Sequence, residues 1–132
     1  MRSILAAGLL VAAGAWGVAA ADDPLVGKWR TERVRGAASV EAAKTAFEVA
    51  ADGRVSSTVG CNRIVGKPSL EGDRLRFGQM AATRMACPSP LDRLETAYMA
   101  ALDAVRSYRV EGARLTLVDE AGRAAVVLVR SE

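Results

Sequence analysis

One stretch of helical periodicity interrupts a chain that otherwise alternates between apolar and polar residues with a period of two. Five apolar residues recur at intervals of three or four and would form one stripe along a helix. Ser89 stands where a helix-capping residue is expected, with Pro90 at the first helical position. The sequence therefore predicts one amphipathic helix, with its stripe formed by Leu91, Leu94, Tyr98, Leu102 and Val105.

The remainder of the chain from residue 22 is typical of short strands joined by tight turns. Asp52-Gly53 is a strong hairpin signal, and Gly-containing turns recur at residues 71–73, 111–112 and 120–122. The stretch 78–85 fits a strand or a loop equally well. The expected strands cover 26–34, 45–50, 54–59 and 64–68, a segment around 75–77, then 108–110, 115–117 and the continuously apolar 125–129.

Strands that are joined by hairpins must run antiparallel, and a single amphipathic helix can cover the concave face of such a sheet. The predicted fold class is therefore α+β. We expect a strongly curved antiparallel sheet, a half-barrel of about seven or eight short strands, wrapped around one amphipathic helix. The continuous apolar run at 125–129 predicts a central strand that is buried on both faces.

The N-terminal residues have the pattern of a secretory signal peptide. Arg2 precedes an uncharged apolar run at 4–18, and three alanines at 19–21 stand before an acidic pair. A transmembrane anchor is the alternative, but a span needs about 20 apolar residues and this run is shorter. We expect a signal peptide at 1–21, a single domain at 22–132, a periplasmic or secreted location, and no membrane span after cleavage.

The charge of the chain argues against nucleic acid as a partner. The 18 basic and 15 acidic residues leave a net charge of only +3. The arginines are scattered along the sequence without a run of like charge, which is typical of a solvated surface rather than of a phosphate-binding face.

The two cysteines, Cys61 and Cys87, are the clearest candidates for a disulfide or for reactive chemistry. An even number of cysteines in an exported chain favours a disulfide. Two unpaired core cysteines, or one reactive thiol, are the alternatives. A catalytic Cys-His pair is impossible because the chain has no histidine.

No other catalytic or metal-binding set is apparent. Zinc usually takes four ligands from Cys and His, and only two such residues are present, so carboxylates would have to complete the set. Asp92 and Glu95 are predicted on the outer face of the helix, and Asp119 and Glu120 in a hairpin turn, so neither pair forms a glycosidase-like site. We expect no enzyme activity, no cofactor and no metal.

Two loops offer residues for a binding surface. Asn62 and Arg63 follow the first cysteine, and Thr83, Arg84 and Met85 precede the second. They could form a polar recognition edge, or Asn62 could hold a tight turn while the arginines order their own loops or pair with acids. The aromatic residues are most simply core or rim residues: Trp29, Phe47, Phe77, Tyr98 and Tyr108. Together with Met80, Met85 and Met99, some of them could instead line an apolar cavity under the sheet.

Several motifs together resemble the META domain family, also called the HslJ-like heat-shock family. They are "GCNRIVG" at 60–66, "FGQMAATRMACP" at 77–88 and "GARLTLVDEAG" at 112–122. "LVGKWR" at 25–30 is similar to the first strand of that family, and "AFEVAADGRVSSTVGCN" at 46–62 to its strand–turn–strand run. Two departures are Ser57 or Thr58, where many relatives have glycine, and the absence of the lipoprotein cysteine.

The resemblance implies a curved antiparallel sheet around one long helix, and it implies no catalytic residues. It also implies a small protein of the bacterial envelope, linked to heat shock or other envelope stress. The leading hypothesis is a monomeric, non-enzymatic factor that binds envelope proteins. The alternative is a carrier of a hydrophobic small molecule or lipid in a cavity between the sheet and the helix.

Overall fold

The computed structural model describes residues 23–41 and 43–131, so the predicted signal peptide lies outside the described residues. This part of the chain forms one helix and ten strands. They are β1 (Gly27–Val34), β2 (Ala46–Val49), β3 (Val55–Thr58), β4 (Arg63–Gly66), β5 (Ser69–Glu71), β6 (Arg74–Arg76), β7 (Ala81–Ala82), α1 (Leu91–Ala104), β8 (Val105–Glu111), β9 (Arg114–Asp119) and β10 (Ala124–Arg130).

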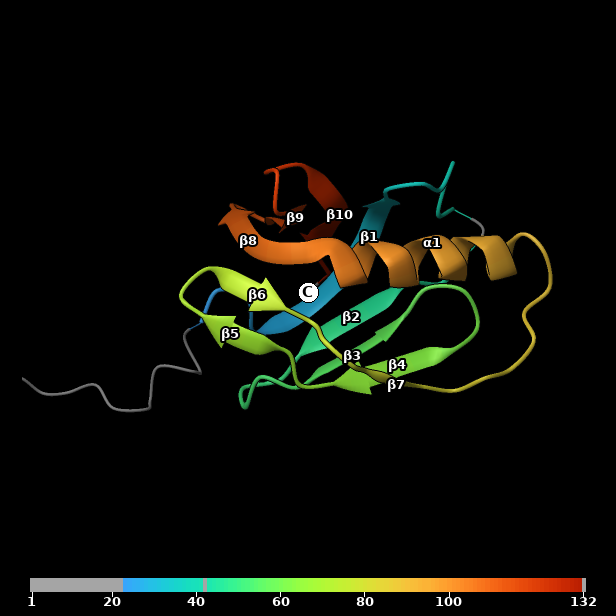
Figure 1. The fold of residues 1–132 in the computed structure, drawn as a ribbon, viewed down its shortest axis with the longest axis horizontal. Coiled ribbons are helices and arrows are strands. Elements are labelled where there is room, and N and C mark those ends of the chain that lie inside the picture. The colour runs from blue at the N-terminus through green and yellow to red at the C-terminus, as the bar shows by residue number, and fades with distance from the viewer. Residues whose placement is uncertain (1–22, 42, 132) are drawn as a thin grey trace, which may run out of the picture.

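All ten strands belong to one antiparallel sheet with the order β5-β6-β8-β9-β10-β1-β2-β3-β4-β7. β4 and β5 lie near opposite edges of this order, yet only Lys67 and Pro68 separate them in sequence. Such a short link spans about 10 Å at most. The sheet must therefore curl until its two edges approach each other, as Figure 1 shows. The predicted α+β half-barrel is confirmed.

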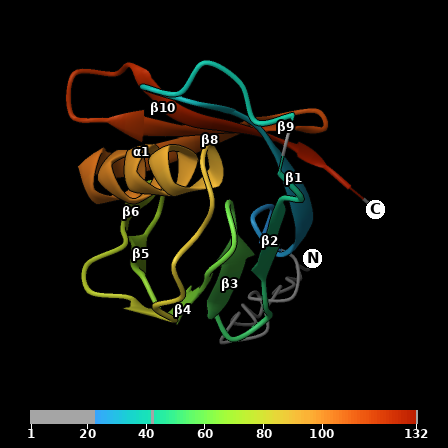
Figure 2. The same cartoon turned by 90° about the vertical axis from the view of Figure 1, so that its right-hand side faces the viewer.

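The curled sheet wraps around α1, which packs on β10, β1 and β9. Figure 2 shows the helix beneath β9 and β10, with β1, β2 and β3 curving around it. The stripe that faces the sheet comprises Leu94, Tyr98, Ala101 and Leu102. The sheet and the helix thus bury each other's apolar face, worth roughly 1.5–3 kcal/mol for each large side chain.

The helix ends differ from the sequence prediction. Pro90 occupies the N-cap position, and no side chain caps the helix. Ser89 lies one residue too early, and the carbonyl oxygen of Pro88 instead accepts hydrogen bonds from the amides of Leu91 and Asp92. At the other end the helix stops at Ala104, and Val105, which was predicted on the helical stripe, begins β8.

The strand count also exceeds the predicted seven or eight. The predicted strand at 64–68 is replaced by β4 and, beyond Pro68, a separate three-residue β5. The stretch 78–85, which was compatible with strand or loop, contains the two-residue β7. Strands this short leave no readable alternation in the sequence.

The central strand was predicted correctly. β10 lies between β9 and β1, and Ala125 to Leu128 are all buried. The core around it contains Trp29, whose indole nitrogen donates a hydrogen bond of 3.0 Å to the carbonyl of Leu25. Within the described residues, no helix has the length and apolarity needed to cross a membrane.

Candidate functional site

Cys61 and Cys87 form a disulfide, as predicted, with their Cα atoms 5.7 Å apart. The bond links the bend after β3 to the segment before α1, closing a loop of 26 residues. On the chain-entropy model, such a loop restricts the unfolded state by roughly 3.5 kcal/mol. In its oxidised form this link makes a structural contribution and requires no reactive thiol.

Asn62 is buried beside this disulfide and ties three segments together. Its side-chain amide donates to the carbonyl of Met85 at 3.0 Å and to Oε2 of Glu95 at 2.8 Å. Its carbonyl oxygen accepts from the hydroxyl of Thr83 at 2.8 Å and from the amide of Met85 at 2.7 Å. The Asn62 side chain thus fixes the two cysteine loops to each other and to the helix.

Glu95 completes this cluster, and its position corrects the sequence prediction. It was assigned to the outer face of the helix, yet its carboxylate turns toward the loops and accepts a hydrogen bond of 3.2 Å from the Asn62 backbone amide. Its Oε1 lies 3.4 Å from Sγ of Cys87. Gly60 permits this approach, because a Cβ atom there would lie only 3.0 Å from that of Glu95. The apolar stripe alone could not reveal it, since Glu95 contacts loops rather than the sheet.

The other predicted surface residues lie around this cluster. Arg63 and Arg84 are exposed and form no ion pair with the described residues, and the Arg63 guanidinium donates to the hydroxyl of Ser56 at 3.3 Å. The exposed Thr83 hydroxyl also accepts from the Arg63 backbone amide. Met85 is 58% exposed. Asn62 differs from these four residues because its side chain is buried. Its amide and carbonyl groups already form hydrogen bonds with Thr83 and Met85 in the cysteine loops.

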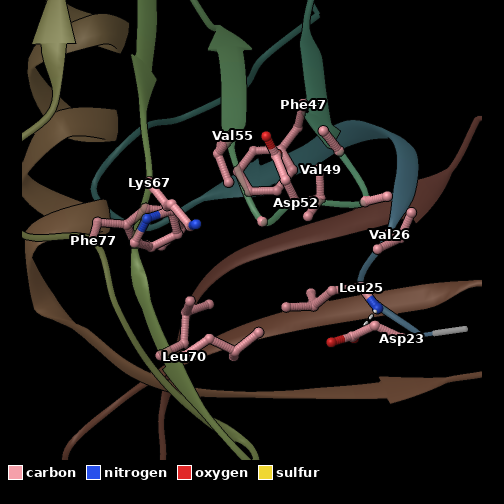
Figure 3. Close-up of a pocket in the computed structure, with 15 residues that line it drawn as sticks. Asp23, Leu25, Val26, Phe47, Val49, Asp52, Val55, Lys67, Leu70 and Phe77 are labelled. Atoms are coloured by element: carbon pink, nitrogen blue, oxygen red, sulfur yellow. Dashed lines mark hydrogen bonds between the residues drawn. The ribbon is translucent and has the colours of Figure 1, made fainter. Parts of the chain in front are cut away.

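A separate apolar pocket of about 240 Å³ opens at the end of the half-barrel, away from this cluster. Its walls are Leu25, Phe47, Val49, Val55, Leu75 and Phe77, all of which are at most 5% exposed. Figure 3 shows Phe47, Val49 and Val55 of β2 and β3 on one side of the space and Phe77, which follows β6, on another. Leu25, from the segment before β1, lies on a third side. Phe47 and Phe77 meet edge to face, with their ring centroids 6.3 Å apart.

The rim of the pocket carries the polar groups. Lys67, Asp52 and Asp23 all line it, and Leu70, which is 38% exposed, stands at the edge strand β5. A recess with apolar walls and a few polar groups at its mouth is the usual form of a site for an apolar or amphipathic ligand.

The pocket follows from the way the sheet curls. α1 covers the part of the concave face formed by β10, β1 and β9, whereas the pocket is lined by β2, β3, the β5–β6 hairpin and the segment before β1. Trp29 and Tyr98 lie in the core, which was the simplest prediction for the aromatic residues. Phe47 and Phe77 line the pocket, as the sequence allowed for some of them. The predicted place of the cavity, between the sheet and the helix, is wrong, because no residue of α1 lines the pocket.

Tyr98 shows how polar groups are satisfied in that core. It is fully buried, and its hydroxyl lies 2.6 Å from the hydroxyl of Ser57, which in turn donates to the carbonyl of Ala46. Burial raises the pKa of Tyr98 far above its usual value, so the phenol remains neutral and is no candidate acid or base at ordinary pH.

Comparison with known proteins places the whole described domain in one family. The family model of the META domain matches residues 23–132. The chain belongs to the META domain family. No curated protein matches it.

Solved structures show the same fold at low sequence identity. An NMR structure of a protein from Burkholderia xenovorans is 22% identical, covers 99% of both chains and has a TM-score of 0.63. A crystal structure of a DUF4847 family protein from Bacteroides vulgatus is 15% identical over 87% of this chain and 98% of its own, with a TM-score of 0.58. At such identities the likeness of these proteins to the META domain concerns the fold alone.

Proposed function

We propose that this META-domain protein is an exported, non-enzymatic binding protein that holds the apolar part of a hydrophobic small molecule or lipid. The observation that carries the proposal is the apolar pocket between β2–β3 and β5–β6, with Lys67, Asp52 and Asp23 at its rim. The pocket lies away from the cysteine loops, where the sequence suggested the binding surface.

The size and lining of the pocket define the ligand class. Six buried apolar side chains form the walls and the charged groups stand only at the mouth. A ligand that removes apolar surface from water gains about 25 cal/mol for each Å² buried, without a need for polar partners inside. An alkyl chain or a small ring system fits this lining, with its polar end at the rim.

A fluorescent apolar probe such as N-phenyl-1-naphthylamine tests the proposal by titration. Val55→Phe fills the pocket from the β3 wall, and Val65→Phe is the matched control because Val65 is 38% exposed on β4. We expect saturable binding that is lost in Val55→Phe and retained in Val65→Phe, with both variants folded by thermal melting. Equal probe binding by the two variants would refute the pocket as the site.

A second variant tests the mouth of the pocket without touching the core. Ala51 is exposed and lines the rim. Ala51→Trp places a bulky side chain over the opening, so it should weaken probe binding while leaving the melting temperature close to that of the wild type.

A protein-binding role in the bacterial envelope, under stress, is the second candidate. The observation that favours it is a shallow surface on the outer face of β2, β3, β4 and β7, where the exposed Val65 is accompanied by Arg54, Arg63 and Lys67 and a single acid, Glu48. Such a surface suits an acidic partner. Charge reversal at Arg63 should then reduce capture of that partner while probe binding in the apolar pocket stays unchanged.

A further inference from the structure

Three potential metal-binding side chains converge at the cysteine loops. The Sγ atoms of Cys61 and Cys87 and a carboxylate oxygen of Glu95 all lie within 4.8 Å of one another, and each residue is only partly buried. Within the part of the chain that the structure describes, the Glu95 carboxylate has no cationic partner. An anionic group is therefore held against two sulfur atoms at a place that solvent can reach.

We propose that Cys61, Cys87 and Glu95 bind a thiophilic divalent cation of the Zn²⁺ or Cd²⁺ type when the disulfide is reduced. Thiolate and carboxylate are both established ligands of such ions, at about 2.3 Å for sulfur and about 2.0–2.2 Å for oxygen in the case of zinc. Three protein ligands leave a fourth, open position for water. The site would thus resemble zinc sites with three protein ligands and one bound water, rather than structural sites in which four cysteines fill every position.

The change of state is a two-electron exchange. A dithiol reductant gives two electrons and two protons to the disulfide, which becomes two thiols, while the reductant itself becomes a disulfide. Binding of the cation by both thiolates then releases the two thiol protons. The oxidised protein has no thiolate to offer, so cation binding depends on the redox state of the cysteine pair.

The site is preorganised because hydrogen bonds join the cysteine loops in addition to the disulfide. Four hydrogen bonds of the Asn62 side chain join them to each other and to Glu95, at 2.7–3.0 Å. Asn62 also orients the Glu95 carboxylate, to which it donates from both its backbone and its side-chain amide. Hydrogen bonds of this kind, from a second layer of residues, fix the orientation of metal ligands and raise affinity.

A hollow of about 300 Å³ provides the entry path. It is lined by Asn62, Met85, Cys87, Glu95 and Met99, among others. The two methionines bring thioether groups, which are further soft donors, to the wall of the same hollow.

The test is a Cd²⁺ titration of the full chain, kept reduced by a phosphine under anaerobic conditions, with binding followed by calorimetry and by the ultraviolet thiolate-to-cadmium absorption band. We expect one equivalent to bind to the reduced wild type and none to the oxidised protein. Glu95→Gln should bind at least tenfold more weakly. Asp92→Asn is the matched control, because Asp92 lines the same hollow but is not one of the three donors.

Three results would overturn the proposal. One is a reduced wild type that binds Cd²⁺ no more tightly than the Cys61→Ser/Cys87→Ser double variant. Another is Glu95→Gln with the affinity of the wild type, which would remove the carboxylate from the ligand set. The third is a reduced chain whose Trp29 fluorescence is that of an unfolded protein, because the Asn62 hydrogen bonds would then be unable to hold the site.

Discussion

Replacing Asn62 by alanine should destabilise the protein more than any other single polar truncation at the cysteine loops. The substitution removes the four shortest side-chain hydrogen bonds of Asn62, to Met85 twice, to Thr83 and to Glu95, and two longer contacts to Glu95 and Cys87. At about 1 kcal/mol for each bond, and with the Met85 backbone groups losing their Asn62 partner, the loss in unfolding free energy is roughly 3–5 kcal/mol. That is a large part of the 5–15 kcal/mol that is typical of a whole domain.

Urea unfolding followed by Trp29 fluorescence measures this change, and the melting temperature should fall by roughly 20 °C. Gln79→Ala is the matched control, because it truncates an exposed amide on the neighbouring loop and should stay within about 0.5 kcal/mol of the wild type. A loss below about 1 kcal/mol for Asn62→Ala would refute the reasoning. The Asn62 bonds would then be replaceable by water, and the loops would not depend on them.

Three further predictions concern stability. Replacing both cysteines by serine should lower the unfolding free energy by roughly 3.5 kcal/mol in denaturant titrations, and an unchanged midpoint would contradict the loop-closure argument. Tyr98→Phe removes the hydroxyl that bonds to Ser57, so calorimetry should show a loss of about 1 kcal/mol in unfolding free energy, whereas a loss above about 3 kcal/mol would contradict the assignment of one hydrogen bond to this hydroxyl. Hydrogen bonds from the Arg123 backbone amide and the Arg35 guanidinium lower the pKa of Asp119. The Asp119 carboxylate therefore contributes fully to the free energy of unfolding above its unfolded-state pKa of 3.8. That contribution is lost as the pH falls through the lower pKa of the folded state. The unfolding free energies of wild type and Asp119→Asn should therefore converge when the proteins are unfolded by acid.

The sequence was sufficient for the fold because the fold depends on local patterns. The alternation at Phe47 and Val49, the Asp52-Gly53 turn and the apolar run at 125–129 each match their observed elements. β5 was missed, and β7 lies in a stretch that the sequence left open between strand and loop, because two or three residues show no periodicity. The helix start was misplaced because the Pro88 carbonyl, and no side chain, satisfies the first amides.

The sites were harder to predict because they depend on which loops and strands meet in space. The pairing of Cys61 with Cys87 was predicted because the chain has two cysteines. Asn62 was selected as a candidate residue because it directly follows Cys61. Glu95 appeared to be a solvated helix residue, so no particular carboxylate was expected beside the two cysteines to complete a metal site. Lys67 and Leu25 gave no signal, since their meeting at one pocket depends on how far the sheet curls.

The most direct test of the proposed function is native mass spectrometry of the protein purified from its own cells. The apolar pocket predicts a co-purifying mass of lipid or small-molecule size on the wild type, displaced by the fluorescent probe and absent from Val55→Phe. A wild-type protein that carries no such mass and does not bind the apolar probe would contradict the account.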